Sequence, residues 1–176
     1  MAKKLTLILF ITLLTLPSLQ LNAQTLSQIG FIVKKALPNV ENIVVIFQKP
    51  KQEQLTKEAR TAYLVTRKKF HLYAILTRSD IPRALYSIRK LKNAAIIVIA
   101  NGSTLNQKGV KYITGKITAK KIPVVSNRDK DTLEGVLLCV VEKGDTLETH
   151  VNKLVAFDLE INLPEEFLAN CIVDVE

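Results

Sequence analysis

The chain alternates short, continuous apolar runs with longer stretches in which apolar residues recur every three or four positions. The runs have the length of strands buried on both faces of a sheet, and they occupy residues 43–47, 71–76, 94–100 and 122–125. The stretches between them have the spacing of helices packed on a sheet, and they occupy residues 51–69, 81–91 and 104–120. Right-handed crossovers between such strands place helices on both faces. We therefore expect a single three-layer α/β domain with a mainly parallel sheet.

Further elements are expected at both ends of this alternation. Residues 26–37 have an amphipathic pattern that stops before Pro38, which predicts a short N-terminal helix. Ser79 or Asp80 is positioned to cap the helix that follows the second strand. After residue 131 we expect a strand, a turn, a loosely alternating edge strand and a closing helix, over residues 136–141, 142–145, 154–157 with 159–162, and 164–169.

Residues 1–23 have the three parts of a secretory signal peptide. Lys3 and Lys4 form the positive start, residues 5–16 form the apolar centre, and Ala23 is the small residue of a cleavage site. The alternative is an uncleaved membrane anchor, for which the apolar run is short. We expect cleavage after Ala23 and export to the periplasm. The remaining chain then divides into an N-terminal helix with a linker and a single α/β lobe, over residues 24–41 and 42–176.

Charge narrows the choice of partners. The full chain has 25 basic and 16 acidic residues and a formal net charge of +9. Without Lys3 and Lys4 the balance is 23 against 16, a net charge of +7. This excess favours an anionic partner, such as a membrane surface, a cell-wall polymer or an acidic ligand, or it is a solvated basic face. Nucleic acid is not expected as a partner of an exported protein.

The two cysteines and two histidines give no metal signal. Cys139 and Cys171 lie in apolar surroundings, where a disulfide after export and two buried free thiols are both open readings. His71 and His150 are far apart in the sequence and neither has a Cys or His neighbour. No metal site is therefore predicted.

Three polar loops follow predicted strands and meet at one edge of the expected sheet. Ligands of open parallel sheets bind beyond the carboxyl ends of the strands. The candidate ligand-binding residues in these loops are Gln48, Lys49, Asn101, Gly102, Ser103, Thr104, Ser126, Asn127, Arg128 and Asp129. The backbone N–H groups of Ser103 and Thr104, expected at a helix start, favour an anionic group. The same residues also fit the turns and caps that any strand-to-helix loop requires.

Five segments resemble, in the same order, the second lobe of ABC transporter substrate-binding proteins. These are type I periplasmic binding proteins, some of which are specific for aromatic amino acids. The segments read NIVVIFQKPKQEQ, TRSDIPRALYSI, IANGST, KIPVVSNRD and INL, at residues 42–54, 77–88, 99–104, 121–129 and 161–163. The second segment matches best, and the resemblance extends over residues 42–170.

The resemblance implies a ligand site, of which this chain supplies only a part. In this family two lobes close on the ligand, and hydroxyls and carboxylates of the equivalent loops hold the charged ends of an amino acid. This chain is expected to supply one lobe, since only the short stretch 24–41 precedes the first strand. Asp129 is the candidate for an ammonium group, whereas Lys49 and Arg128 suit an anion.

Two functions follow from these residues. The first is a solute-binding or sensing component related to ABC transport. It would hold an amino acid or an anion in a cleft completed by a homodimer or by a membrane transporter or sensor. The second is a protein-interaction module for a periplasmic or membrane partner, without small-molecule binding.

An enzyme is not expected. Ser103 and Ser126 lack a nucleophile elbow, and the pair Glu165 and Glu166 fits helix-start charges. The sequence has no phosphate-binding glycine loop, and no cofactor is predicted.

Overall fold

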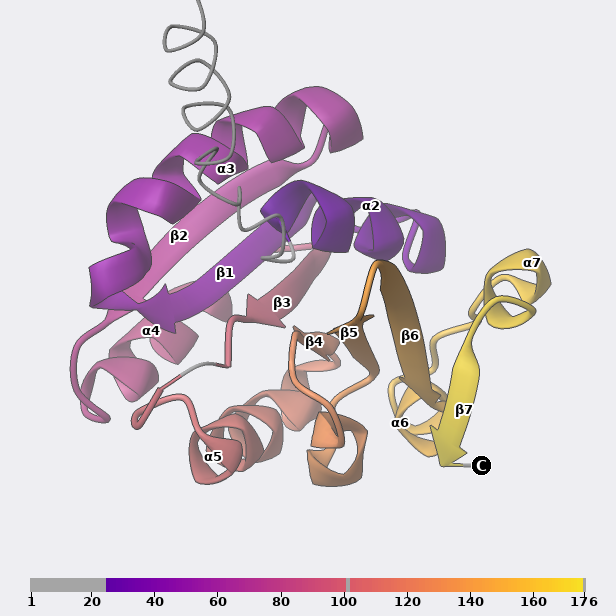
Figure 1. The fold of residues 1–176 in the computed structure, drawn as a ribbon. Helices are drawn as coiled ribbons and strands as arrows, with labels where there is room; N and C mark the ends of the chain where they lie inside the picture. The colour runs from indigo at the N-terminus through magenta and orange to yellow at the C-terminus, as the bar shows by residue number, and fades with distance from the viewer. Residues whose placement is uncertain (1–24, 101, 176) are drawn as a thin grey trace, which may run out of the picture.

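Seven strands form one sheet in the computed structural model, which describes residues 25–100 and 102–175 (Figure 1). The strands are β1 Asn42–Gln48, β2 Lys69–Ile75, β3 Ala94–Val98, β4 Val124–Ser126, β5 Leu138–Lys143, β6 Thr146–Asn152 and β7 Ile172–Val175. Their order is β2-β1-β3-β4-β5-β6-β7. Only the β5–β6 pair is antiparallel, so β6 and β7 run against the first five strands. The predicted mainly parallel sheet is confirmed.

Helices cover both faces of the sheet and complete three layers (Figure 1). One apolar core lies beneath α2, α3, α6 and α7, and a second lies beneath α4 and α5. The helices are α2 Leu26–Ala36, α3 Gln52–Thr66, α4 Asp80–Ile88, α5 Gln107–Ile117, α6 Lys153–Asp158 and α7 Glu165–Leu168. Three short 3-10 turns join them to the strands: η1 Lys49–Lys51, η2 Thr118–Lys120 and η3 Asp131–Glu134.

The centre of β1 explains why an unbroken apolar run is needed there. Ile43, Val45 and Phe47 belong to the core beneath α2 and α3. Val44 and Ile46 belong to the core beneath α4 and α5. All five residues are 0% exposed, and full burial of each such side chain stabilises the fold by about 1.5–3 kcal/mol. A strand with helices on both sides has no solvent-facing position left for a polar residue.

The predicted N-terminal helix is confirmed as α2. Thr25 and Gln28 form a capping box, in which the Thr25 side chain accepts from the N–H of Gln28 and the Gln28 side chain accepts from the N–H of Thr25. The N–H of Leu26 donates to Glu58 Oε2 at 2.8 Å, which ties the start of α2 to α3. The helix ends at Ala36, two residues before Pro38.

Ser79 occupies the N-cap position of α4, but the predicted capping hydrogen bond is absent from its side chain. Asp80 instead contacts the turn that precedes the helix. Its Oδ2 accepts from the N–H of Thr77 at 2.8 Å and from the N–H of Leu76 at 3.0 Å. These two backbone hydrogen bonds hold the pKa of the Asp80 carboxyl below its ordinary value. The contact fixes the turn between β2 and α4.

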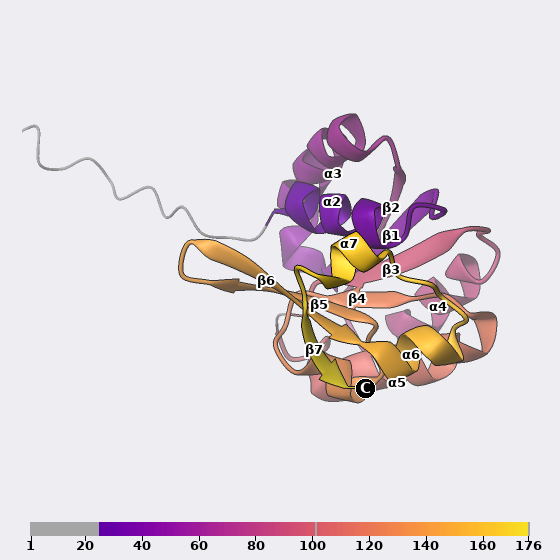
Figure 2. The same ribbon diagram turned by 90° about the vertical axis from the view of Figure 1, so that its right-hand side faces the viewer.

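The C-terminal third differs from the expected pattern. The predicted edge strand over residues 154–157 and 159–162 is wrong, because residues 153–158 form helix α6. Asn152 caps this helix, and its side-chain Oδ1 accepts from the N–H of Val155 at 2.9 Å. The predicted strand near residues 136–141 is confirmed as β5, but β6 and β7 had not been expected. The β5–β6 hairpin extends beyond the rest of the sheet (Figure 2).

Polar contacts of Asp174 hold β7 at the edge of the sheet. Asp174 accepts from the Thr132 hydroxyl at 2.6 Å, and its other oxygen lies 2.8 Å from His150 Nδ1. Burial alone would raise the pKa of Asp174, but the hydrogen bonds with His150 and Thr132 outweigh burial and lower it. On β6, a hydrogen bond with Lys143 at 2.6 Å lowers the pKa of Glu148. His150 on β6 thus links this strand to Asp174 on β7, which is a structural role.

The two cysteines are free thiols on opposite faces of the sheet. Cys139 belongs to the core beneath α4 and α5, whereas Cys171 packs against the other core. Of the two alternatives, two free thiols are confirmed, although Cys171 is half-buried rather than buried. Burial, reinforced by the nearby charge of Asp131, raises the pKa of Cys139 to about 12, and burial raises the pKa of Cys171 to about 11.

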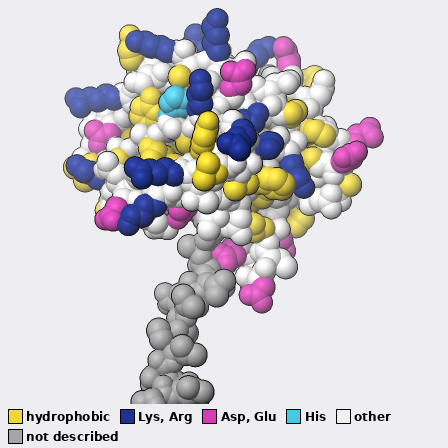
Figure 3. All heavy atoms as spheres, turned by 90° about the horizontal axis from the view of Figure 1, so that it is seen from above, with side chains coloured by type: hydrophobic (Ala, Val, Ile, Leu, Met, Phe, Trp, Pro, Cys, Tyr) yellow, Lys and Arg dark blue, Asp and Glu magenta, His cyan; other side chains and the backbone are white. Residues whose placement is uncertain are grey.

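The predicted signal peptide, residues 1–23, lies outside the described residues. Within the described part of the chain, no helix combines the length and apolar character needed to cross a membrane. Lys and Arg side chains spread over the face seen in Figure 3, with acidic and apolar side chains among them. The net positive charge of the chain is therefore distributed rather than gathered in one spot on this face.

Candidate functional site

The loops after β1 and β3 meet at the carboxyl edge of the sheet. Gly102 has φ of +112°, and a Cβ at this position would lie 2.1 Å from Gln48 Oε1. A side chain at 102 would therefore collide with the Gln48 amide and strain the backbone. The structure brings Gln48 and Gly102 together, as the sequence predicts for loops of adjacent parallel strands.

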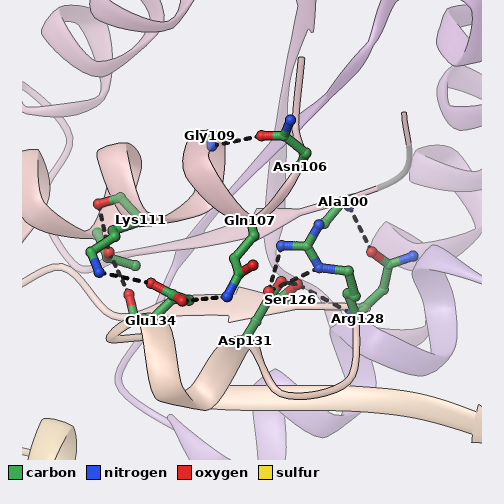
Figure 4. Close-up of polar contacts among 11 residues, drawn as sticks. Ala100, Asn106, Gln107, Gly109, Lys111, Ser126, Arg128, Asp131 and Glu134 are labelled. Atoms are coloured by element: carbon green, nitrogen blue, oxygen red, sulfur yellow. Dashed lines mark hydrogen bonds and ion pairs between the residues drawn. The ribbon is translucent and has the colours of Figure 1, made fainter. Parts of the chain in front are cut away.

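Asn127 connects the loop after β4 to the end of β3. Its Oδ1 accepts from the N–H of Ala100 at 2.7 Å (Figure 4). Three strand-end loops are thus in contact at one edge. The amide of Asn127, half-buried in this position, satisfies a backbone group that the end of β3 leaves without a ladder partner.

Asp131 organises the remaining polar side chains of the β4 loop. It is 1% exposed and accepts from the Ser126 hydroxyl at 2.5 Å. Its other oxygen accepts from Arg128 Nε at 2.9 Å and Nη2 at 2.5 Å (Figure 4). The N–H of Arg128 also donates to Ser126 Oγ at 3.2 Å. The Arg128 charge is therefore compensated inside the protein, and Ser126 is used as a structural hydroxyl.

Sequence reasoning missed this role of Asp131. It placed the carboxylate of the site at Asp129, which is exposed. No local pattern separates the two aspartates. Their difference arises because the chain after Lys130, at φ of +63°, turns back so that Asp131 points at Ser126.

Glu134 fixes the start of α5 next to this cluster. Its Oε1 accepts from Gln107 Nε2 at 2.5 Å, and its Oε2 lies 3.3 Å from Lys111 Nζ. Its backbone carbonyl accepts from the Thr114 hydroxyl at 2.7 Å. Figure 4 shows these side chains beside the Asp131 cluster. The carboxyl edge is thus braced by two acidic side chains with several donors each.

The predicted helix start at residue 104 is wrong. α5 begins at Gln107, and the Asn106 side chain accepts from the N–H of Gly109 at 3.1 Å. Ser103 and Thr104 therefore precede the helix, and their N–H groups are not part of its first turn. The side chain of Asn106 already occupies one of the donors that a helix start offers.

The other predicted site residues differ in their exposure. Lys49, in η1, and Ser103 are exposed, whereas Thr104 is buried. Asn101 lies outside the described residues. Among the residues that the structure describes, no group of three or more His, Cys, Asp or Glu side chains is placed to hold a metal ion.

Comparisons with known proteins identify the fold. No protein-family model matches the sequence, and no curated protein matches it. Solved structures do match. One is a conserved domain protein from Vibrio cholerae, at a TM-score of 0.71 and 16% identity, with 84% of this chain and 59% of that chain covered.

Two further matches are binding proteins. The first is an ABC domain in complex with L-Trp from Streptococcus pneumoniae, at a TM-score of 0.70 and 17% identity, covering 82% of this chain and 58% of that one. The second is a substrate-binding protein with adhesive properties from Clostridium difficile, at a TM-score of 0.71 and 13% identity, covering 86% and 60%. This chain thus has the fold of one lobe of a periplasmic-binding-protein-like structure. It spans about three-fifths of the length of each of these neighbours.

Proposed function

We propose that this chain is an exported, half-size solute-binding protein related to ABC transport. It binds a small solute, either an amino acid or an anion, at the carboxyl edge of its sheet, and it corresponds to the second lobe of a type I binding protein. The observation that carries the proposal is the meeting of the β1, β3 and β4 loops at that edge. The fold shared with substrate-binding proteins supports it.

Each part of the proposed site has its own role. Lys49 is exposed and attracts an anionic group, while Gln48 and Asn127 offer amides. Asp129 is the carboxylate for an ammonium group. Ser126 and Arg128 position the loop through Asp131 rather than reaching the ligand directly. The loop after β3 supplies the remaining candidates. Ser103 and Thr104 contribute hydroxyl groups, and the backbone of the loop contributes further polar groups at Asn101 and Gly102.

One lobe supplies one wall of a cleft, so the proposal includes a second wall. A second copy of the chain, or a membrane transporter or sensor, closes the site. In this proposal residues 1–23 direct export and are then cleaved, and the intact mass of the mature protein tests the cleavage. We expect a mature N-terminus at Gln24.

Calorimetric titration of the mature protein tests ligand binding. The panel contains L-tryptophan, the other amino acids, phosphate and sulfate, and light scattering in parallel measures the oligomeric state. We expect Lys49→Ala to weaken binding of an anionic ligand by about tenfold, the loss of one charged contact. Lys57→Ala, an exposed lysine on α3, serves as the matched control and should bind like the wild type. Silence across the whole panel contradicts a small-molecule role.

A protein-interaction module is the second candidate. It is favoured by the way Ser126, Asn127 and Arg128 already satisfy groups of the protein itself. In this case the carboxyl edge docks on a periplasmic or membrane protein without a small ligand. Crosslinking from a cysteine placed at exposed Ser103 in the native envelope distinguishes the two, since recovery of the monomer alone counts against a protein partner. In both cases we expect no enzymatic activity.

A further inference from the structure

A hollow lies at the amino-terminal edge of the sheet, opposite the candidate site. Its volume is about 620 Å³, within the range of about 300–1,000 Å³ that is usual for small-molecule sites. It is lined by the end of α2 and by the connections before β1, β3, β4 and α7, and it is open to solvent. It therefore shares no residue with the carboxyl-edge site.

The inner walls of this amino-edge cavity are apolar. Leu37, Val40 and Ile122 line it and are 5%, 7% and 7% exposed. Leu91 and Ile161 line it and are half-buried. These five side chains come from four different connections, so the apolar surface exists only in the folded chain. Such a surface gains free energy by excluding water with the apolar part of a ligand.

The rim of the cavity is basic. Arg89, Lys92, Lys120 and Lys121 line it, against the single carboxylate of Glu160. Lys121 pairs with Glu160 at 2.5 Å.

Two of the rim cations are not compensated. Arg89 donates to the carbonyl of Lys116 at 2.9 Å, which directs its guanidinium to the end of α5. In the described part of the chain, no carboxylate lies within ion-pair distance of Lys92 or Lys120. The rim thus offers two ammonium groups to a ligand.

Helix dipoles explain part of this charge. α4 and α5 end at this edge, and the partial negative charge of a helix C-terminus attracts cations. That attraction accounts for basic residues in the last turns, such as Lys116 in α5 and Lys120 in the η2 turn that follows it. It does not account for an apolar-walled cavity beneath uncompensated lysines.

We propose that the amino-edge cavity binds an amphiphilic anion. The apolar body of the ligand lies against Leu91, Ile122 and Ile161, and its phosphate, sulfonate or carboxylate group lies between Lys92 and Lys120. This chemistry has two sources: a soluble organic anion, or an anionic lipid whose headgroup remains in a membrane. The site is independent of the carboxyl-edge function.

Fluorescence titration with 1-anilinonaphthalene-8-sulfonate, an aromatic sulfonate that brightens in apolar surroundings, tests the site. The paired substitution Lys92→Glu and Lys120→Glu should weaken binding at least about tenfold, because it replaces two attractions by two repulsions. Lys57→Glu with Lys108→Glu changes the net charge equally on exposed helix positions outside the cavity, and should change binding less than about twofold. Equal effects of the two pairs overturn the proposal.

Competition experiments and a second variant test the anionic group and the apolar body of the ligand separately. Dodecyl phosphate should displace the probe, whereas dodecyl maltoside and inorganic phosphate should not. Ile161→Trp fills the cavity and should also abolish binding. Because this variant could disturb folding, chemical-shift mapping on the wild type provides an independent readout. Perturbations from dodecyl phosphate must centre on Leu91, Lys120 and Ile161, and perturbations elsewhere overturn the site.

Vesicles identify the source. Sedimentation with phosphatidylglycerol vesicles, lost with the Lys92/Lys120 pair but not with the control pair, indicates a membrane lipid. Binding of the dodecyl phosphate monomer without vesicle binding indicates a soluble anion. If the protein binds neither the vesicles nor the dodecyl phosphate monomer, the proposal is overturned.

Discussion

The two edges of the sheet treat their charged side chains in opposite ways. At the carboxyl edge, the buried Asp131 gathers the hydroxyl of Ser126 and the guanidinium of Arg128, and the loop is closed by its own hydrogen bonds. At the amino edge, Lys92 and Lys120 stand over a cavity and pair with no carboxylate of the described chain. The hydrogen-bonded cluster at the carboxyl edge stabilises the fold. The lysines at the amino edge contribute little to the free energy of unfolding, and their charge is available to a ligand.

This difference separates structural polar residues from residues available for recognition. A buried acid with several donors is costly to remove, because its partners lose their compensation. An exposed cation without a partner contributes little to the free energy of unfolding. Substitutions at the two edges should therefore have very different effects on stability.

The largest effect is expected for Asp131→Ala. The substitution leaves Ser126 and the guanidinium of Arg128 without their acceptor, and it should lower the free energy of unfolding by about 3 kcal/mol. Urea unfolding measures the loss. Asp129→Ala removes an exposed aspartate two residues away and should change stability by less than about 0.5 kcal/mol. Similar losses in both variants would remove the distinction between the two aspartates.

Gly102→Ala tests the contact between the β1 and β3 loops. At φ of +112° an alanine should cost about 1–2 kcal/mol of backbone strain, and its Cβ also displaces the Gln48 amide. Gly115, in α5, has no heavy atom within 4 Å of an added Cβ. Gly115→Ala should therefore raise stability by up to about 1 kcal/mol through helix propensity. A neutral result at residue 102 would mean that this loop is not held in place.

Stability should fall in acid through the carboxylates at the end of the sheet. The folded-state pKa values of Asp174 and Glu148 lie below their ordinary values. Their contribution is thus present above the ordinary pKa of about 4 and is lost as the pH falls through the folded-state value. Thermal unfolding between pH 7 and pH 2 should show the decrease, and Asp174→Asn should make it smaller. Asp145→Asn, exposed in the hairpin turn, should leave the pH profile of the wild type unchanged.

The smallest effect is expected at the amino edge. Lys92→Gln together with Lys120→Gln should change the free energy of unfolding by less than about 0.5 kcal/mol. The same urea experiment measures it, with the Asp131 variant as the reference for a large loss. A loss comparable to that variant would show that these lysines are structural, and the contrast between the edges would fail.

The parallel half of the fold was predictable because its burial is local. Every position of β3 is buried. A continuous apolar run of this short length therefore indicates a buried strand. β6 was missed for the opposite reason. Its sequence TLETHVN is polar, and the buried Thr149, His150 and Asn152 are tolerated only through tertiary contacts such as that of His150 with Asp174.

α6 and the two sites illustrate further limits of the sequence. The apolar residues of α6 suit a strand or a helix equally, and the Asn152 cap decides between them. The meeting of the β1, β3 and β4 loops was predictable, because loops after adjacent parallel strands end at the same edge. The roles within it were not, since the direction of Asp131 depends on the backbone at Lys130. The lining residues of the amino-edge cavity come from four separate connections, and no sequence pattern indicates that these connections meet.

Each of the two apolar cores has one cysteine beside it, so local opening of each core can be followed by the rate at which its thiol is alkylated. A cysteine is alkylated as its thiolate, and pKa values of about 12 for Cys139 and about 11 for Cys171 leave almost none at neutral pH. Cys139 is also wholly enclosed, so its alkylation must await local opening. Its labelling rate reports separation of α4 and α5 from the sheet. The half-buried Cys171, whose Sγ donates to the Phe167 carbonyl at 3.2 Å, reports opening around α7. The native sequence thus carries two reporters of local unfolding, one for each core.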